Sequence, residues 1–286
     1  MCDDNHKGLI PYTSLTRRQF AGLAAAAGAG LASPAAAQPG KVSERDVEVR
    51  APDGVADAAL FHPEGAGKWP GVLVWPDASG LRAALREMGR RLAAQGYVVL
   101  VVNPYYRSGP ASATAASGTG QDAAQRERRG AMRALLTDEA VTRDAAAFVA
   151  YLDALPQTSD AKVGVQGYCM GGAMAFRTAA VAPGRIGAVG SFHGGGLATQ
   201  NPNSPHLLIE KTTARFLVAV AKNDDAADPA AKDVLRESFA RTGRPATVEV
   251  FGGNHGWCVP DNGSYLAAEA ERAWSALLAL YKTGLV

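Results

Sequence analysis

The sequence predicts an α/β protein: one domain built on a mostly parallel, eight-stranded sheet with helices on both faces. Eight short apolar runs of β type recur between residues 47 and 251, and stretches with helical period separate most of the later ones. The runs GVLVW and YVVLVV are apolar at every position. Strands that are buried on both faces of a parallel sheet require such runs.

The expected strands and helices follow this alternation along the chain. The expected strands span 47–50, 56–62, 71–75, 98–102, 163–166, 188–192, 216–220 and 247–251, and the expected helices span 81–95, 138–155, 170–181, 229–242 and 264–282. No helix separates the first two strands, which predicts an antiparallel hairpin turned at Pro52, Asp53 and Gly54. Segment 108–136 is longer than a usual strand-to-helix connection, and it is either a lid near the active site or a solvated insertion.

Residues 1–37 are predicted to be an export signal, which leaves 38–286 as the single folded domain. Arg17 and Arg18 precede an Ala-rich apolar run over 20–31, and three alanines at 35–37 offer a small-residue cleavage site. Paired arginines in this place resemble a bacterial twin-arginine signal, which the export machinery reads as an address. An Ala-rich helix or a membrane anchor is the alternative, but the run is shorter than the roughly 20 residues that a spanning helix needs. We therefore expect a periplasmic or secreted protein with no stable membrane anchor.

Composition and motifs exclude several classes of function. The formal net charge is only +2, which gives no reason to expect nucleic acid as a partner. The chain has no CxxC pair, no HExxH and no Walker-type glycine loop, so no metal, no organic cofactor and no paired-cysteine redox centre is predicted. Cys169 and Cys258 are the two cysteines left after signal cleavage, which is too few for a disulfide scaffold.

The segment VGVQGYCMGG indicates where the chemistry occurs. It reads as a strand, a sharp turn and the start of a helix, with Cys169 at the turn and glycines on both sides. Serine hydrolases place their nucleophile in this context with the pattern GxSxG. A helix N-terminus also favours a thiolate. A cysteine buried for packing is the alternative, but the setting favours Cys169 as the nucleophile.

A nucleophilic thiol needs a base, and the base needs an orienting acid. His255 directly follows the last predicted strand and is the favoured base, with His193 as the second choice. The acid follows another strand in the run AKNDD, where Asp224 comes first and Asp225 is the alternative. Neighbouring side chains point apart, so only one of the two carboxylates is expected to meet the imidazole.

These residues resemble the dienelactone hydrolase family of α/β hydrolases. The resemblance is carried by GYCMGG, AKNDD, NHGW, WPDASGLR and NPYYR, which span most of the chain after residue 37. It implies the α/β-hydrolase fold and a triad of Cys169, His255 and Asp224. It also implies an oxyanion hole formed by the amides of Ala78 and Met170.

The resemblance implies two further roles. Asp77 stands where the family has an acidic residue that holds the resting thiol, although the usual residue there is glutamate. Arg107 matches an arginine that helps to bind a substrate carboxylate, but a second arginine after the histidine is missing here. A surface arginine is the alternative for Arg107.

Aromatic residues and one histidine are further candidates for the substrate pocket. Tyr105, Tyr106 and Trp257 either form an aromatic wall for an acyl group or pack in the core, and His193 is expected in a pocket wall or a packed loop. The predicted function is hydrolysis of a small-molecule ester or lactone through an acyl-thioenzyme, of the carboxymethylenebutenolidase type. An exported, non-catalytic ligand-binding protein on a hydrolase scaffold is the alternative.

Overall fold

The computed structural model describes residues 41–115 and 123–286 of the chain. The predicted export signal at 1–37 lies outside the described residues, as does the middle of segment 108–136. Residues Pro39–Val286 group into one unit by their contacts. No helix among the described residues is long and apolar enough to cross a membrane.

The sheet has eight strands, and all of them except β2 run in the same direction. The strands are β1 (Val42–Ala51), β2 (Gly54–Pro63), β3 (Gly71–Trp75), β4 (Val98–Val102), β5 (Val163–Tyr168), β6 (Ile186–Phe192), β7 (Arg215–Ala221) and β8 (Ala246–Phe251). Their order across the sheet is β1-β2-β4-β3-β5-β6-β7-β8. β1 and β2 pair antiparallel as a hairpin, β2 pairs antiparallel with β4, and every later pairing is parallel. The predicted edge hairpin and the mostly parallel sheet are confirmed.

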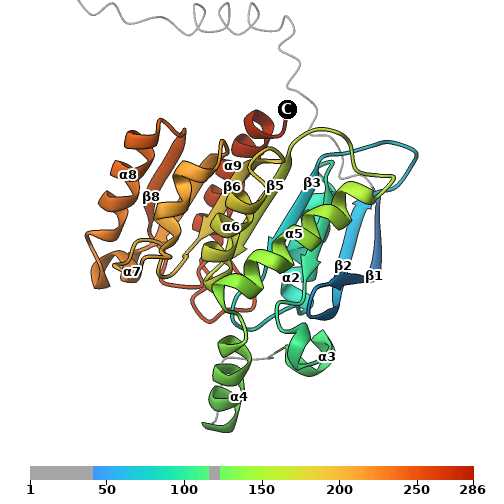
Figure 1. Ribbon diagram of the computed structural model, residues 1–286, viewed down its shortest axis with the longest axis horizontal. Helices are drawn as coiled ribbons and strands as arrows, with labels where there is room; N and C mark the ends of the chain where they lie inside the picture. Colours follow the sequence, from blue (N-terminus) through green and yellow to red (C-terminus); the bar gives the residue numbers. More distant parts are fainter. Residues whose placement is uncertain (1–40, 116–122) are drawn as a thin grey trace, which may run out of the picture. The chain divides into compact units, whose positions relative to one another are not determined.

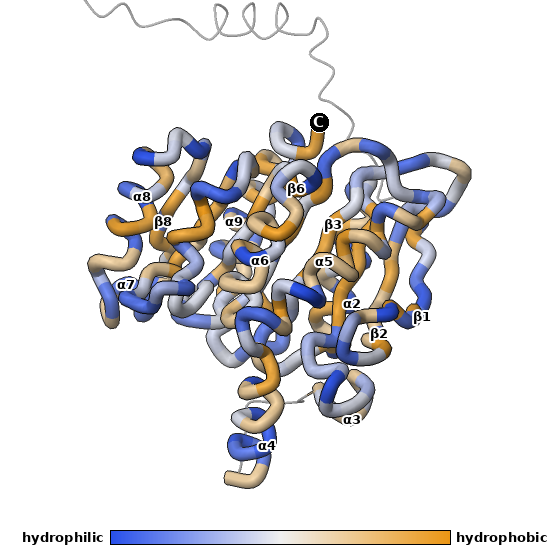
Figure 2. Tube along the Cα trace, viewed as in Figure 1, coloured by the Kyte–Doolittle hydropathy of each residue, from blue (hydrophilic) through white to orange (hydrophobic). Residues whose placement is uncertain are grey.

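Helices cover the sheet on both faces (Figure 1). The longer helices are α2 (Ala83–Ala93), α4 (Ala123–Ala134), α5 (Asp138–Ala154), α6 (Met170–Val181), α8 (Ala231–Thr242) and α9 (Ala267–Gly284). Two separate apolar clusters fill the layers. One joins the sheet to α5, α6 and α8, and the other joins it to α2 and α9. The central strands carry continuous apolar stretches in Figure 2, which agrees with burial on both faces.

The structure adds helices that periodicity did not predict. Segment 108–136 contains α3 (Ala111–Thr114) and all of α4, and α7 (Lys222–Ala227) follows β7 directly. Within α4 only Met132 is buried, and α7 buries no residue. Neither helix therefore lays a broad apolar face on the sheet. The other predicted strands and helices are present with ends shifted by a few residues.

Candidate active site

Cys169 occupies a sharp turn between the end of β5 and the start of α6. Its backbone has φ 55° and ψ −119°, one of two positive φ values among the described non-glycine residues. Such a conformation costs of order 1–3 kcal/mol for a residue with a side chain, and it persists only where the surroundings impose it. The thiol is partly exposed and unpaired. The fold thus presents the sulfur at the carboxyl edge of the sheet, at a helix N-terminus.

The glycines around Cys169 are explained by close backbone contacts. A Cβ on Gly167 would collide with the carbonyl of Gly171. A Cβ on Gly171 would lie 2.5 Å from the carbonyl oxygen of Trp75 and 2.7 Å from that of Pro76. The first turn of α6 therefore packs directly against the end of β3, and only glycine permits this approach.

His255 and Asp224 form a hydrogen-bonded pair near the elbow. The distance from His255 Nδ1 to Asp224 Oδ2 is 2.7 Å, and the backbone N–H of His255 donates to Asn223 Oδ1 at 2.7 Å. Both partners come from α7, so this short helix orients the imidazole. Asp225 instead accepts from Lys232 Nζ at 2.7 Å. Only one of the adjacent carboxylates meets the imidazole, and the structure places Asp224 there.

The surroundings of His255 favour its charged form. A side-chain hydrogen bond with Cys169 is the largest influence, and together with the Asp224 carboxylate it raises the pKa of His255 to about 9 against the opposing effect of burial. His255 therefore has the Cys169 thiol as a neighbour and is hydrogen-bonded to Asp224 through Nδ1. Cys169, His255 and Asp224 are therefore neighbours in that order, which is the order that a nucleophile, a base and an orienting acid require.

Two backbone amides beside the elbow have no acceptor among the described residues. They belong to Ala78, in the loop after β3, and to Met170, the first residue of α6. The hydroxyl of Tyr105 lies 3.1 Å from the Ala78 carbonyl oxygen and 3.4 Å from Met170 Sδ, so it links the two segments. Tyr105 is 1% exposed, which places it in the core beneath them and not in an aromatic substrate wall.

Asp77 is engaged by a neighbour other than the thiol. Its two oxygens accept from the two terminal nitrogens of Arg82 at 2.7 and 3.0 Å, and one also accepts from the Ser79 N–H at 2.9 Å. Within residues 41–115 and 123–286, no hydrogen bond connects Asp77 with Cys169. The expected role of Asp77 as holder of the resting thiol has no support in this geometry, because a bidentate pair with Arg82 fixes the carboxylate.

Arg107 is likewise engaged within the fold. Its guanidinium donates twice to Asp144 at 2.8 Å and also to Asp53, and it lies over the ring of Tyr106. The Tyr106 hydroxyl donates to the same Asp144 at 2.7 Å. A carboxylate of a substrate would have to displace these partners. Both side chains stabilise the junction of α5 with the β1–β2 turn, and their contact with a substrate stays a prediction.

His193 and Trp257 are packed below the site. They are 1% and 0% exposed, Trp257 stacks on Phe251 with a ring separation of 4.8 Å, and the His193 ring lies 4.8 Å from that of His255. Burial and the nearby charge of His255 lower the pKa of His193 to about 3. His193 is thus a neutral, buried neighbour of the base, and neither residue offers a surface to an acyl group.

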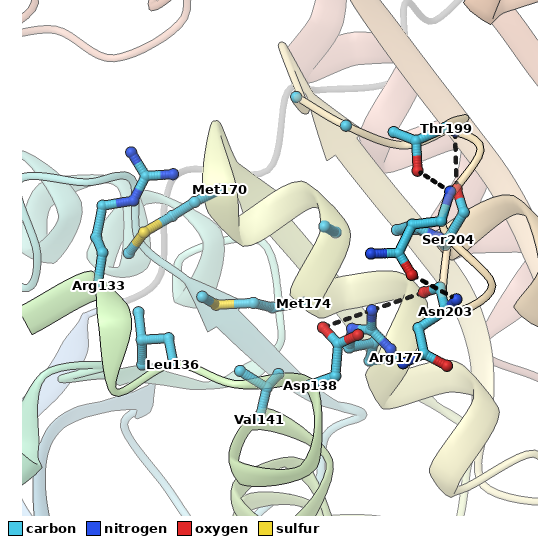
Figure 3. Close-up of a pocket in the computed structure, with 15 residues that line it drawn as sticks. Arg133, Leu136, Asp138, Val141, Met170, Met174, Arg177, Thr199, Asn203 and Ser204 are labelled. Atoms are coloured by element: carbon cyan, nitrogen blue, oxygen red, sulfur yellow. Dashed lines mark hydrogen bonds and ion pairs between the residues drawn. The ribbon is translucent and has the colours of Figure 1, made fainter. Parts of the chain in front are cut away.

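A cavity of about 350 Å³ opens beside the first turns of α6. Figure 3 shows Arg133 and Leu136 on one side of it, Thr199, Asn203 and Ser204 on the other, and Met170 and Met174 between them. Its remaining lining residues are Asp138, Val141, Ala173, Arg177, Gly195, Gly196, Asn201 and Pro205. Arg177 pairs with Asp138, whereas Arg133 has no ion pair or hydrogen bond with another described residue.

Apart from Met170, these lining residues were missed by sequence reasoning. They come from the end of α4 and the link to α5, from α5 and α6, and from the loop after β6, and no motif connects these segments. The sequence did mark 108–136 as a candidate lid, and the end of this segment does border the cavity through Arg133 and Leu136. No group of three or more His, Cys, Asp and Glu side chains in the described parts of the chain could hold a metal ion.

The comparisons with known proteins agree with this fold. Residues 56–285 match the model of the dienelactone hydrolase family. A carboxymethylenebutenolidase of Pseudomonas putida is 30% identical over 161 residues, which are 56% of this chain and 65% of that protein. The structure of a dienelactone hydrolase-like promiscuous phosphotriesterase from metagenomic libraries has a TM-score of 0.71 at 25% identity, covering 86% of this chain and all of that one.

A structure from Klebsiella pneumoniae is also similar, with a TM-score of 0.74 at 18% identity over 85% of this chain and 99% of that one. At that identity it supports the fold alone, which is an α/β-hydrolase fold. The family match spans most of the chain and includes the elbow, the cavity and the His255 loop. The chain therefore belongs to the dienelactone hydrolase family and is a hydrolase that acts on ester or lactone bonds.

Proposed function

We propose that this protein hydrolyses a carboxylic ester or lactone through a covalent acyl-thioenzyme on Cys169. The observation that carries the proposal is the chain of contacts at the elbow. Cys169 is partly exposed in a strained turn, its thiol is the main influence that raises the pKa of the neighbouring His255, and His255 Nδ1 lies 2.7 Å from Asp224 Oδ2. This arrangement suits nucleophilic catalysis by a thiolate.

In the first half of the reaction, Cys169 Sγ attacks the carbonyl carbon of the ester. The developing oxyanion accepts hydrogen bonds from the N–H groups of Ala78 and Met170. The His255 imidazolium gives its proton to the leaving oxygen as the carbon–oxygen bond breaks. The product of this half is an alcohol or enol together with a thioester on Cys169.

In the second half, neutral His255 takes a proton from water, and the water oxygen attacks the thioester carbonyl. The same two amides hold the second oxyanion. The carbon–sulfur bond then breaks, and the sulfur leaves as a thiolate beside the imidazolium. Asp224 keeps Nδ1 protonated throughout, so that Nε2 faces the thiol.

The substrate class follows from the cavity beside Met170. Thioether and aliphatic side chains line one part of it, and polar groups and Arg133 line the rest. Such a mixed lining fits a small acyl group with a polar or anionic end. The carboxymethylenebutenolidase named among the relatives makes an enol lactone the first substrate to test.

The test compares p-nitrophenyl acetate with a dienelactone as substrates of the wild-type protein and of Cys169→Ala and Cys169→Ser. Turnover of both substrates that depends on Cys169 supports the proposal in full. Turnover of the aryl ester alone keeps the mechanism and rejects the lactone. Saturable binding of esters without any acylation would favour the alternative, a non-catalytic binding protein on the same scaffold.

We also propose that the protein is exported through a twin-arginine signal and acts in the periplasm or outside the cell. The paired Arg17 and Arg18 ahead of the short apolar run support this. Fusing residues 1–37 to a reporter that matures only in an oxidising compartment tests it. Export that persists after Arg17→Lys and Arg18→Lys are combined would contradict a twin-arginine route.

A further inference from the structure

His193 lies directly behind the nucleophile elbow, and the proposed reaction gives it no part. It follows the last residue of β6 and has a positive φ of 41°. Its own N–H donates to the Ala219 carbonyl oxygen at 2.8 Å, so the neighbouring strand β7 fixes its backbone. The side chain is almost completely buried, at 1% exposure. A buried histidine in this conformation has little freedom to turn its ring.

The His193 ring contacts the backbone of the nucleophile. Its Nδ1 accepts a hydrogen bond from the Cys169 N–H at 3.1 Å, and the same N–H also donates to the Phe192 carbonyl oxygen at 3.0 Å. A ring nitrogen that accepts carries no proton, so the proton of the neutral ring is on Nε2. The lowered pKa of His193, about 3, agrees with a ring that stays neutral beside a charged His255.

The second ring nitrogen of His193 lies in an unfavourable environment. His193 Nε2 is buried and has no hydrogen-bond partner among the described residues. A buried donor without a partner is destabilising, because it has lost its hydrogen bond to water. The other ring nitrogen, Nδ1, accepts the hydrogen bond from the Cys169 N–H, and the His193 ring lies 4.8 Å from the His255 ring. One side chain therefore contacts both the elbow and the base.

We infer that His193 is a positioning residue, which holds the Cys169 N–H through Nδ1 and packs against the His255 ring, so that sulfur and base stay aligned. The Cys169 turn is strained, and a second acceptor on its N–H limits how far the turn can relax. A small displacement of a reacting atom is enough to slow an enzyme strongly. This inference rests on the proposed role of Cys169 as nucleophile.

Three substitutions at His193 separate the hydrogen bond from the packing. His193→Asn places an oxygen near the position of Nδ1, and asparagine tolerates a positive φ. His193→Gln moves its amide to the position of Nε2, and His193→Phe keeps a ring without an acceptor. His206→Gln is the control, because His206 bonds to Ser204 and contacts neither the elbow nor His255.

The readouts are the acylation rate with p-nitrophenyl acetate, the rate of Cys169 alkylation by iodoacetamide, and thermal unfolding. We expect His193→Phe and His193→Gln to slow acylation and alkylation by about tenfold or more, with KM changed less than kcat. His193→Asn should stay within about threefold of the wild type, as should His206→Gln. If His193→Asn is as slow as His193→Phe, or if His193→Phe retains wild-type rates, the inference is wrong.

The wild-type protein offers a test that needs no variant. Long-range ¹H–¹⁵N spectra distinguish the two neutral tautomers of a histidine, and His193 should show a bare Nδ1 and a protonated Nε2 at neutral pH. An Nδ1–H tautomer or an imidazolium would overturn the inference. If none of the tested esters acylates Cys169 in the wild type, the proposed function fails. The tautomer and the alkylation rates still decide the role of His193 in that case.

Discussion

Cys169 and Cys258 differ in almost every property that sets the reactivity of a thiol. Cys169 lies near His255 in space, whereas Cys258 lies near it along the chain. Cys169 is partly exposed, sits at a helix N-terminus, and its thiol is the main influence that raises the pKa of His255. Cys258 is buried, and burial raises the pKa of its thiol well above the usual range. The surroundings of a cysteine, and not its distance in sequence from a histidine, decide whether it can act as a nucleophile.

The two thiols also lie on opposite faces of the sheet. Cys169 packs with the cluster under α5, α6 and α8, whereas Cys258 belongs to the cluster under α2 and α9. Cys258 lines a separate cavity of about 200 Å³, together with Tyr168 and Phe192. These two aromatic residues directly precede Cys169 and His193, so the apolar layer behind the sheet supports the catalytic loops from below.

The largest expected effect separates the two cysteines directly. Cys169→Ala should lower kcat/KM for an activated ester by about 10⁴-fold or more, because it removes the nucleophile. The matched variant Cys258→Ala should change kcat/KM by less than about threefold and cost some stability through the small cavity that it leaves. Steady-state kinetics and thermal unfolding measure both. Equal losses of activity in the two variants would contradict the contrast.

The next comparison is between two adjacent carboxylates. Asp224→Asn should reduce kcat by about 10²–10⁴-fold, because the amide no longer holds the protonated Nδ1 of His255 in place. Asp225→Asn removes only a partly exposed pair with Lys232, which is worth roughly 0–1 kcal/mol, and should leave kcat nearly unchanged. If Asp225→Asn lowered kcat more than Asp224→Asn does, Asp225 and not Asp224 would be the acid that orients His255.

The charge state of His255 gives a pH test. Its pKa in the folded protein is about 9, above the ordinary 6.5, so the stabilisation from its contacts is complete below about pH 6.5 and is lost as the pH rises through 9. Histidine NMR signals should show a midpoint near 9 in the wild type and a lower one in Cys169→Ser. Asp224→Asn should move it less, since the contact with Cys169 is the larger cause. An unshifted midpoint in Cys169→Ser would show that the thiol does not contact the base.

The smallest expected effect on catalysis distinguishes two arginines. Arg107→Gln leaves the buried Asp144 without its charged partner and should destabilise the fold by about 3 kcal/mol, with little change in KM. Arg133→Gln should leave stability unchanged and raise KM a few-fold for an ester with an anionic acyl group. A neutral ester such as p-nitrophenyl acetate is the control. A KM effect from Arg107→Gln alone would restore the role that its sequence motif suggests.

Much of the fold was predictable because each central strand has a distinct physical signal. Strands β3 and β4 are apolar at every position, since both of their faces are covered, and their predicted ends match the structure. The elbow was predictable for a different reason. Gly167 and Gly171 have no room for a side chain. The close backbone contacts of the turn therefore require glycine at these two positions, and the sequence shows them on either side of Cys169.

The rest of the site depends on contacts between residues that no local pattern connects. Arg107 meets Asp144 across 37 positions, so the sequence could not show that its guanidinium is already engaged. Asp224 was favoured because it comes first in the run after β7, but α7 is a short polar helix that buries no residue, and only the contact with His255 distinguishes Asp224 from Asp225. His193 resembled a pocket residue because it follows a strand, and only the structure shows its ring turned toward the Cys169 N–H.

The most direct test of the central claim is to trap the acyl-enzyme. The wild-type protein is mixed with p-nitrophenyl acetate, quenched with acid within milliseconds, digested and mapped by mass spectrometry. We predict one added acetyl group on the peptide that contains Cys169 and none on the peptide that contains Cys258. Rapid turnover with an unmodified Cys169, or an acetyl group on another residue that forms at the rate of turnover, would contradict the account.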